Sequence, residues 1–293
     1  MEAKLREIQE SAWAKLNISL DVTDKRPDGY HDMIMVMQTI SLSDSVRVTL
    51  NDTGKVRAKT NFSFIPGDER NLAVKAALKY LEKIGAQDQG MLIEIEKRIP
   101  VGAGMAGGSA NAAAVLRALN RIYGRALDNE TLEELSATVG SDVPFCLRGG
   151  TVLATGRGEK MEDLPEMPDC CYVVCKPEFS ISTPELFRKL DQISLRCHPD
   201  TAGIVDALKK GSLDGICRRM YNVFEDVDDR RLRTVKDIKS LMLDHGALGA
   251  MMTGTGSAVF AIFRKGADTK ALVEQLRAAY GFCETAENIT RLN

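Results

Sequence analysis

The chain has 293 residues, of which 44% are hydrophobic and 27% charged, as expected for a globular protein of one large or two ordinary domains. Lys and Arg total 39 against 41 Asp and Glu, and the net charge of −2 argues against partners such as nucleic acid or an anionic membrane. The longest apolar runs are too short to span a bilayer, and the charged N-terminus is unlike a signal sequence.

Cysteine and histidine usage predicts neither a disulfide framework nor a metal site. The seven Cys are scattered, odd in number and contain no C-x-x-C pair, which indicates reduced thiols. The three His lie far apart and lack H-E-x-x-H spacing. We therefore expect a cytoplasmic protein that acts on a small molecule, as a monomer or weak homodimer.

The first third of the chain predicts strands followed by a helix. Strands are predicted from apolar runs or alternation at 12–22, 32–40 and 44–50. Turn residues, including an Asp-Gly pair, separate the first two. A loop at 61–70 then leads into a helix over 71–84, whose apolar residues recur at helical spacing.

Residues 91–123 form the most informative stretch. Ile93 and Ile95 alternate with glutamates as in a half-buried strand, and four glycines follow within 102–108. Apolar residues then recur at helical spacing until Gly124, a plausible helix end. A strand, a glycine loop and a helix N-terminus together predict an anion site, because their N–H groups point at one place.

The rest of the chain predicts a further set of short elements. Helices are expected at 130–139, 201–210, 212–220, 229–244 and 268–280, and strands at 151–155, 171–175 and on both sides of 253–257. Between Gly140 and Pro144, Asp142 lies on a fixed turn. Another helix starts with Thr183 as N-cap and Pro184 as its first residue. A soft domain boundary falls at 156–168.

Three interpretations of the glycine loop compete. Its glycines fit the dinucleotide fingerprint G-x-G-x-x-G, but no acid ends a second strand about 20 residues later. The Walker pattern fails because no Lys follows the glycines. The second interpretation is a glycine-rich turn without a ligand, and the third rests on a longer match.

A longer pattern resembles the phosphate loop of the GHMP kinase superfamily. Its residues are Pro100, Val101, Gly102, Ala103, Gly104, Met105, Ala106, Gly107, Gly108, Ser109 and Ala110. The N-terminal Ala-x-Ala-Lys-Leu-Asn at 12–17 and the second glycine loop, Thr-Gly-Thr-Gly-Ser at 253–257, follow the order of that superfamily. Asp-Gly-Tyr-His at 28–31, Gly-Ser-Asp-Val-Pro-Phe at 140–145 and Ser-Thr-Pro-x-x-Phe at 182–187 resemble its 4-diphosphocytidyl-2-C-methyl-D-erythritol kinase family.

The resemblance implies a two-domain α+β fold. Residues 1–160 would form an ATP-binding domain similar to ribosomal protein S5 domain 2, and residues 161–293 a ferredoxin-like domain. It also implies ATP and Mg²⁺ as cofactors and phosphorylation of the 2-hydroxyl of the CDP-linked methylerythritol. This reaction belongs to the non-mevalonate route to isoprenoid precursors.

The same resemblance assigns residue roles. Lys15 and Asp142 would be catalytic, with Asp142 as base or orienting group for the hydroxyl. Asn71 and Lys97 would join the glycine loop in binding ATP, and Ser109 would reach a phosphate or Mg²⁺. The acceptor would contact Asn17, Tyr30, His31, Thr183, Phe187, Thr255 and Gly256. Tyr30 and Phe187 would sandwich the cytosine ring, since aromatic faces stack well.

Other functions compatible with these residues are a GHMP kinase for mevalonate, homoserine or a sugar, a nucleotide-binding regulator without catalysis, and a nicotinamide-dependent oxidoreductase. The presence of Lys15 and Asp142 disfavours the regulator.

Overall fold

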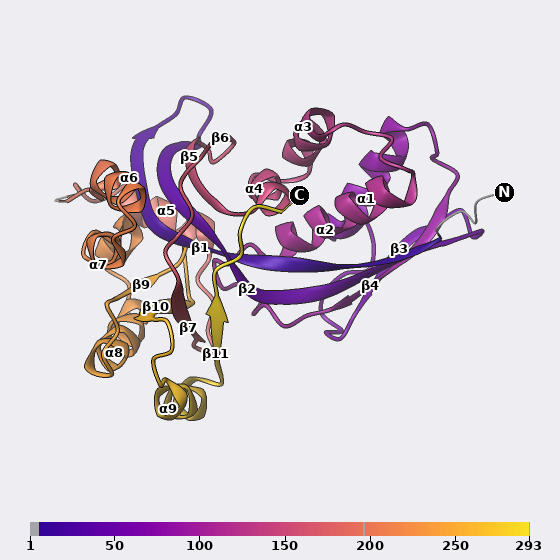
Figure 1. Cartoon of the computed structure of the whole chain (residues 1–293). Helices are drawn as coiled ribbons and strands as arrows, with labels where there is room; N and C mark the ends of the chain where they lie inside the picture. The colour runs from indigo at the N-terminus through magenta and orange to yellow at the C-terminus, as the bar shows by residue number, and fades with distance from the viewer. Residues whose placement is uncertain (1–5, 196, 293) are drawn as a thin grey trace.

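The structure, a computed structural model, describes residues 6–195 and 197–292, which form two β-sheets with helices packed against them (Figure 1). The first sheet contains β1 (Glu7–Lys25), β2 (His31–Asn51), β3 (Val56–Thr60), β4 (Gly90–Glu96), β5 (Thr151–Gly156), β6 (Lys160–Asp163) and β8 (Tyr221–Asn222). The second contains β7 (Cys170–Lys176), β9 (Gly249–Met252), β10 (Val259–Arg264) and β11 (Phe282–Glu287).

The long hairpin of β1 and β2 is the backbone of the first sheet. The prediction of separate strands at 32–40 and 44–50 was wrong, because β2 is continuous from His31 to Asn51. A register shift opposite Trp13 and Ala14 interrupts its pairing with β1. Before this irregularity β2 pairs with β5, and after it with β4, so one strand has two different neighbours.

Four helices cover one face of this sheet (Figure 1). They are α1 (Leu72–Lys83), α2 (Gly107–Ile122), α3 (Asn129–Val139) and α4 (Val143–Arg148). The side chain of Asn71 caps α1 and that of Asp128 caps α3, and each helix buries an apolar stripe. The helices predicted at 71–84, after the glycine loop and at 130–139 are confirmed. The turn expected around Asp142 continues instead as α4.

The second sheet has the connectivity of a ferredoxin-like domain. Its strand order is β11-β7-β10-β9 and all neighbours are antiparallel. In chain order, α8 (Arg231–Asp244) lies between β7 and β9, and α9 (Lys270–Tyr280) between β10 and β11. This β-α-β-β-α-β arrangement confirms the predicted two-domain α+β fold.

Three helices are inserted between β7 and α8. They are α5 (Thr183–Leu190), α6 (Thr201–Lys209) and α7 (Leu213–Cys217), and the short 3-10 helix η1 (Val223–Asp226) follows them. One of the three, α6, packs against β2 (Figure 1). The predicted N-cap of α5 was wrong by one residue, because Ser182 is the N-cap and Thr183 already has helical geometry. The Thr183 hydroxyl is therefore available for another contact.

No single residue divides the chain between the two sheets. β6 begins at Lys160 and pairs with β5, and β8 returns to pair with β1 after β7 has joined the second sheet. The boundary at 160/161 stays a prediction. Among the described residues, no helix is both long and hydrophobic enough to cross a bilayer.

Candidate active site

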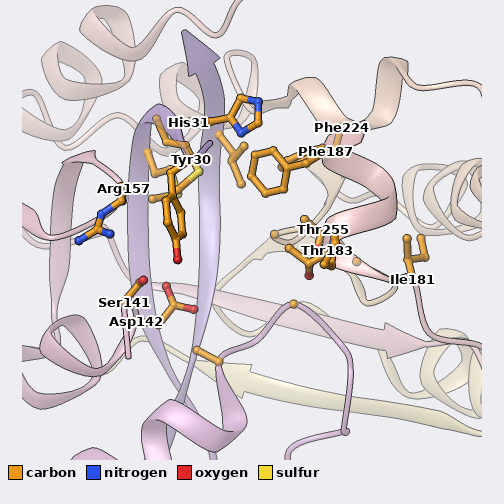
Figure 2. Close-up of a pocket in the computed structure, with 18 of the residues that line it drawn as sticks. Tyr30, His31, Ser141, Asp142, Arg157, Ile181, Thr183, Phe187, Phe224 and Thr255 are labelled. Atoms are coloured by element: carbon orange, nitrogen blue, oxygen red, sulfur yellow. The ribbon is translucent and has the colours of Figure 1, made fainter. Parts of the chain in front are cut away.

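A cavity of about 750 Å³ lies where the two glycine loops, the β1–β2 hairpin tip and α5 meet. Four basic side chains and two carboxylates line it, so its charge favours an anionic ligand. These side chains are Lys15, Lys25, Arg157, Arg188, Asp142 and Asp191. Figure 2 shows His31 and Phe187 at one end of the cavity, and Ser141 and Asp142 at the other.

The first glycine loop presents a helix N-terminus to the cavity. Gly102 and Gly104 have positive φ angles of 65° and 74°, and Ala106, the N-cap of α2, is also left-handed. No side chain caps α2, and its first turn contains no acidic residue. Its first N–H groups and the positive end of its dipole are thus left for an anion.

The second glycine loop packs directly on the first. A Cβ atom on Gly104 would lie 2.2 Å from the carbonyl oxygen of Thr253. The Ala258 N–H donates to the Ala103 carbonyl oxygen over 3.2 Å, and the Thr253 hydroxyl donates to the Gly104 carbonyl oxygen over 3.3 Å. This close approach requires glycine at position 104 and ties the first glycine loop to the second one.

Lys15 is a buried cation at the base of the cavity. It is 5% exposed, and its Nζ donates to the Oδ1 of Asn17 over 2.6 Å. No carboxylate in the described part of the chain forms an ion pair with it. Removing a charge from water without pairing it is costly. Lys15 is therefore suited to meet negative charge supplied by a ligand.

Asp142 is the carboxylate at the same end of the cavity. It occupies the N-cap position of α4, but its side chain makes no capping hydrogen bond. Cys146 lies behind it. Burial raises the pKa of that thiol and the charge of Asp142 adds to this rise, whereas the Lys15 cation acts in the opposite direction. The opposite charges of Lys15 and Asp142 thus act on the same small region.

The other end of the cavity is aromatic. The rings of His31 and Phe187 stack with centroids 4.7 Å apart, and Phe187 meets Phe224 edge-on at 4.9 Å. Tyr30 is 57% exposed, and the Arg157 guanidinium lies 5.0 Å from its ring centroid. Figure 2 shows the Tyr30 hydroxyl pointing toward Asp142 and Ser141. Aromatic rings at one end of a cavity can hold a flat base.

Comparison with known proteins identifies the family. The family of GHMP kinase N-terminal domains matches residues 71–150, and that of GHMP kinase C-terminal domains matches residues 204–281. A 4-diphosphocytidyl-2-C-methyl-D-erythritol kinase of Listeria monocytogenes is 45% identical over 94% of this chain and 92% of the relative. The enzyme of that name from Bacillus subtilis is 43% identical over 94% of each chain. The chain belongs to the 4-diphosphocytidyl-2-C-methyl-D-erythritol kinase family.

Solved structures agree with the 4-diphosphocytidyl-2-C-methyl-D-erythritol kinase family. The crystal structure of 4-(cytidine 5'-diphospho)-2C-methyl-D-erythritol kinase superposes with a TM-score of 0.77 at 33% identity, covering 96% of this chain and 98% of that one. A homoserine kinase from Cytophaga hutchinsonii has a TM-score of 0.78, covering 99% and 97% of the two chains. At 21% identity this second match shows the shared fold alone.

In this 4-diphosphocytidyl-2-C-methyl-D-erythritol kinase family member, twelve of the predicted site residues line the cavity. They are Lys15, Tyr30, His31, Gly102, Gly104, Ala106, Ser109, Asp142, Thr183, Phe187, Thr255 and Gly256. The Thr183 and Thr255 hydroxyls are 2.7 Å apart, which links α5 to the second glycine loop. Asn17 supports the cavity from below through Lys15.

Besides Asn17, nine predicted residues do not line this cavity. They are Asn71, Lys97, Pro100, Val101, Ala103, Met105, Gly107, Gly108 and the buried Ala110. Both ends of the Asn71 amide are engaged, by Ala73 N–H and by the Pro66 carbonyl oxygen. The Lys97 amine is paired with Asp44 and donates to Asn111 Oδ1 over 3.1 Å. These two side chains already have structural partners.

Sequence reasoning missed several residues that line the cavity, namely Lys25, Ser141, Arg157, Arg188 and Asp191. They come from the hairpin tip, the turn before α4, the β5–β6 turn and α5. No local pattern marks them, because they converge only when distant segments pack. Ser141 alone was within reach, as the neighbour of Asp142.

Proposed function

We propose that the protein transfers the γ-phosphate of ATP to the 2-hydroxyl of 4-diphosphocytidyl-2-C-methyl-D-erythritol. The observation that carries this proposal is the meeting of three features in one cavity. They are a glycine-loop helix N-terminus, a buried Lys15 that no described carboxylate pairs with, and Asp142, whose side chain makes no capping hydrogen bond. The stacked pair of His31 and Phe187 supports a base-bearing acceptor, which mevalonate, homoserine or a sugar lacks. The protein would act in the cytoplasm, as a monomer or weak homodimer, in isoprenoid precursor synthesis.

In this reaction the acceptor oxygen bonds to the γ-phosphorus, and the bond from that phosphorus to the β–γ bridging oxygen breaks to leave ADP. Asp142 accepts a hydrogen bond from the 2-hydroxyl and receives its proton. Lys15 offsets the negative charge that develops on the transferred group. The N–H groups at the start of α2 cradle the phosphates.

The donor groups fit a magnesium ion held mainly by nucleotide phosphates. Ser109 offers a hydroxyl beside the helix N-terminus, while no cluster of three His, Cys, Asp or Glu among the described residues forms a metal site. Mg²⁺ often takes only one or two protein ligands and keeps several waters. When bound, it neutralises charge on the β- and γ-phosphates.

A coupled assay of ADP formation tests the proposal. Purified protein with ATP and Mg²⁺ should form ADP with the CDP-linked methylerythritol, and not with mevalonate, homoserine or galactose. Asp142→Asn should lower kcat by about a hundredfold to ten-thousandfold, since it loses its base. Asp206→Asn, which removes only an exposed ion pair with Lys210, is the matched control. Faster turnover of another acceptor, or nucleotide binding without turnover of any acceptor, would overturn the proposal.

A further inference from the structure

Asp191 joins the end of α5 to the β1–β2 hairpin, beside the aromatic end of the cavity. Its Oδ1 lies 2.7 Å from Nε2 of His31, and its Oδ2 accepts from Nζ of Lys25 over 2.5 Å. The Lys25 hydrogen bond and then the His31 contact hold the pKa of this carboxyl below its ordinary value. Asp191 is therefore ionised near neutral pH, and both of its oxygens can only accept hydrogen bonds.

Two contacts fix the orientation of the His31 ring. One is the hydrogen bond to Asp191, and the other is the stack on Phe187, whose planes are inclined by 23°. Phe187 is itself held edge-on by Phe224. The His31 side chain is only 9% exposed, so the ring has little room to turn over.

The hydrogen bond also decides which ring nitrogen carries the proton. A neutral imidazole has one N–H donor and one acceptor nitrogen. Because the Asp191 carboxylate accepts from Nε2, that nitrogen holds the proton and Nδ1 becomes an acceptor. Figure 2 shows a ring nitrogen of His31 turned into the cavity.

We propose that Asp191 is a positioning residue that makes His31 selective for cytosine over uracil in the acceptor nucleotide. Cytosine offers an exocyclic amine that can donate to Nδ1, whereas uracil offers a carbonyl oxygen at the same place. Two acceptors facing each other cannot form a hydrogen bond, so uracil leaves both groups unsatisfied. This inference rests on the proposed function, because it assigns the base pocket of that same site.

The first test compares kcat/KM for the CDP-linked and UDP-linked methylerythritol. The unaltered protein should favour the CDP-linked acceptor by about tenfold to a hundredfold, the usual range for one base-edge contact. In Asp191→Asn the amide can either accept from Nε2 or donate to it, which permits both tautomers of His31. The preference should then fall by about tenfold, mainly through KM for the CDP-linked acceptor.

Two matched variants separate tautomer control from loss of charge. Lys25→Met removes the other partner of Asp191 but leaves the carboxylate on His31, so the preference should stay unchanged. Asp206→Asn removes a carboxylate from an exposed ion pair on α6, and should alter neither preference nor turnover. If Asp191→Asn slows both acceptors equally and keeps the preference, the proposal is overturned.

Two measurements do not require turnover. Calorimetric titration with CDP and UDP should give the same order of affinities, and NMR correlation of ring nitrogens with ring protons should show His31 protonated at Nε2. With only three His in the chain, the assignment is simple. Absence of kinase activity combined with these results would reject the proposed function and keep the role of Asp191. An Nδ1-protonated His31 in the unaltered protein would reject that role alone.

Discussion

Two lysines of the first domain are buried to nearly the same degree but have different surroundings. Lys15 is 5% exposed and Lys97 is 8% exposed. Lys97 is paired with Asp44, which also accepts from the backbone N–H groups of Arg98 and Ile99. Within residues 6–195 and 197–292, the Lys15 amine has an amide oxygen, Oδ1 of Asn17, as its hydrogen-bond partner and no carboxylate. The fold offsets the burial of the Lys97 charge with a carboxylate, and it does not do so for the Lys15 charge. The contrast that separates these two lysines is therefore the partner of the charge, and not its degree of burial.

The largest expected effect lies at Lys97. Lys97→Met leaves the Asp44 carboxylate buried without its cation, and should lower the free energy of unfolding by about 3–5 kcal/mol. Denaturant unfolding followed by circular dichroism measures this loss. Lys59→Met, at an exposed position on β3, should change stability by less than about 0.5 kcal/mol. Equal stability of the two variants would contradict a structural role for Lys97.

Lys15→Met should show the opposite pattern. It should lower kcat by about a hundredfold to a thousandfold, as expected for removing one charge-stabilising group. Its free energy of unfolding should stay constant or rise by about 1 kcal/mol, because a cation without a carboxylate partner is no longer buried. Steady-state kinetics and denaturant unfolding, measured on the same preparation, give kcat and the free energy of unfolding. A folded but strongly destabilised variant with normal kcat would remove the contrast with Lys97.

Gly104→Ala tests whether the two glycine loops act as one unit. The new Cβ would lie 2.2 Å from the Thr253 carbonyl oxygen at a φ of +74°, so the loops must separate. We expect a loss of about 1–3 kcal/mol of stability and a raised KM for ATP. Gly246→Ala is the matched control, since Gly246 has a φ of +86° but no atom within 4 Å of an added Cβ. Gly246→Ala should lose stability through backbone strain, whereas its KM for ATP should stay unchanged.

The smallest effect on stability is expected for a third lysine, Lys25, which is exposed and forms an ion pair with Asp191. Asp191→Asn removes the ion pair with Lys25, whose side chain is 58% exposed, and should cost less than about 1 kcal/mol near neutral pH. A lowered pKa in the folded state means that this contribution is present above the unfolded carboxyl pKa of about 3.9 and is lost as pH falls through the folded value. The unfolding curves of the two proteins should therefore converge in acid. A gap that persists there would point to lost packing rather than lost charge.

Periodicity predicted the elements whose apolar residues lie along one face. The helices α1, α3, α6, α8 and α9 were found because each carries such a stripe. The short strand β6 was missed because it is mostly exposed and carries no hydrophobic alternation. The continuity of β2 was missed because its apolar pattern changes between 40 and 44. Only its pairing with β1 shows that the strand continues through this irregularity.

The residues of the candidate site also divide into those that local motifs predict and those that they do not. Local motifs predicted the glycine loop, Lys15, Asp142 and the aromatic end, because each motif lies within a few consecutive residues. The different states of Lys15 and Lys97 could not be predicted, because Asp44 lies more than fifty positions from Lys97 and meets it only across β2 and β4. Asp191 is 160 positions from His31 and has no marker of its own.

The sequence by itself determined the family, because the motifs that carry the resemblance are contiguous, and the resemblance in turn implied the two-domain α+β fold. Periodicity and the same motifs indicated the segments that surround the cavity. Only the tertiary structure decided which buried charges are paired, how the two glycine loops lock together and which carboxylate orients His31. The physical reason is that pairing of charges depends on distances of a few ångströms between side chains from separate segments. Such distances exist only after the sheets and helices have packed.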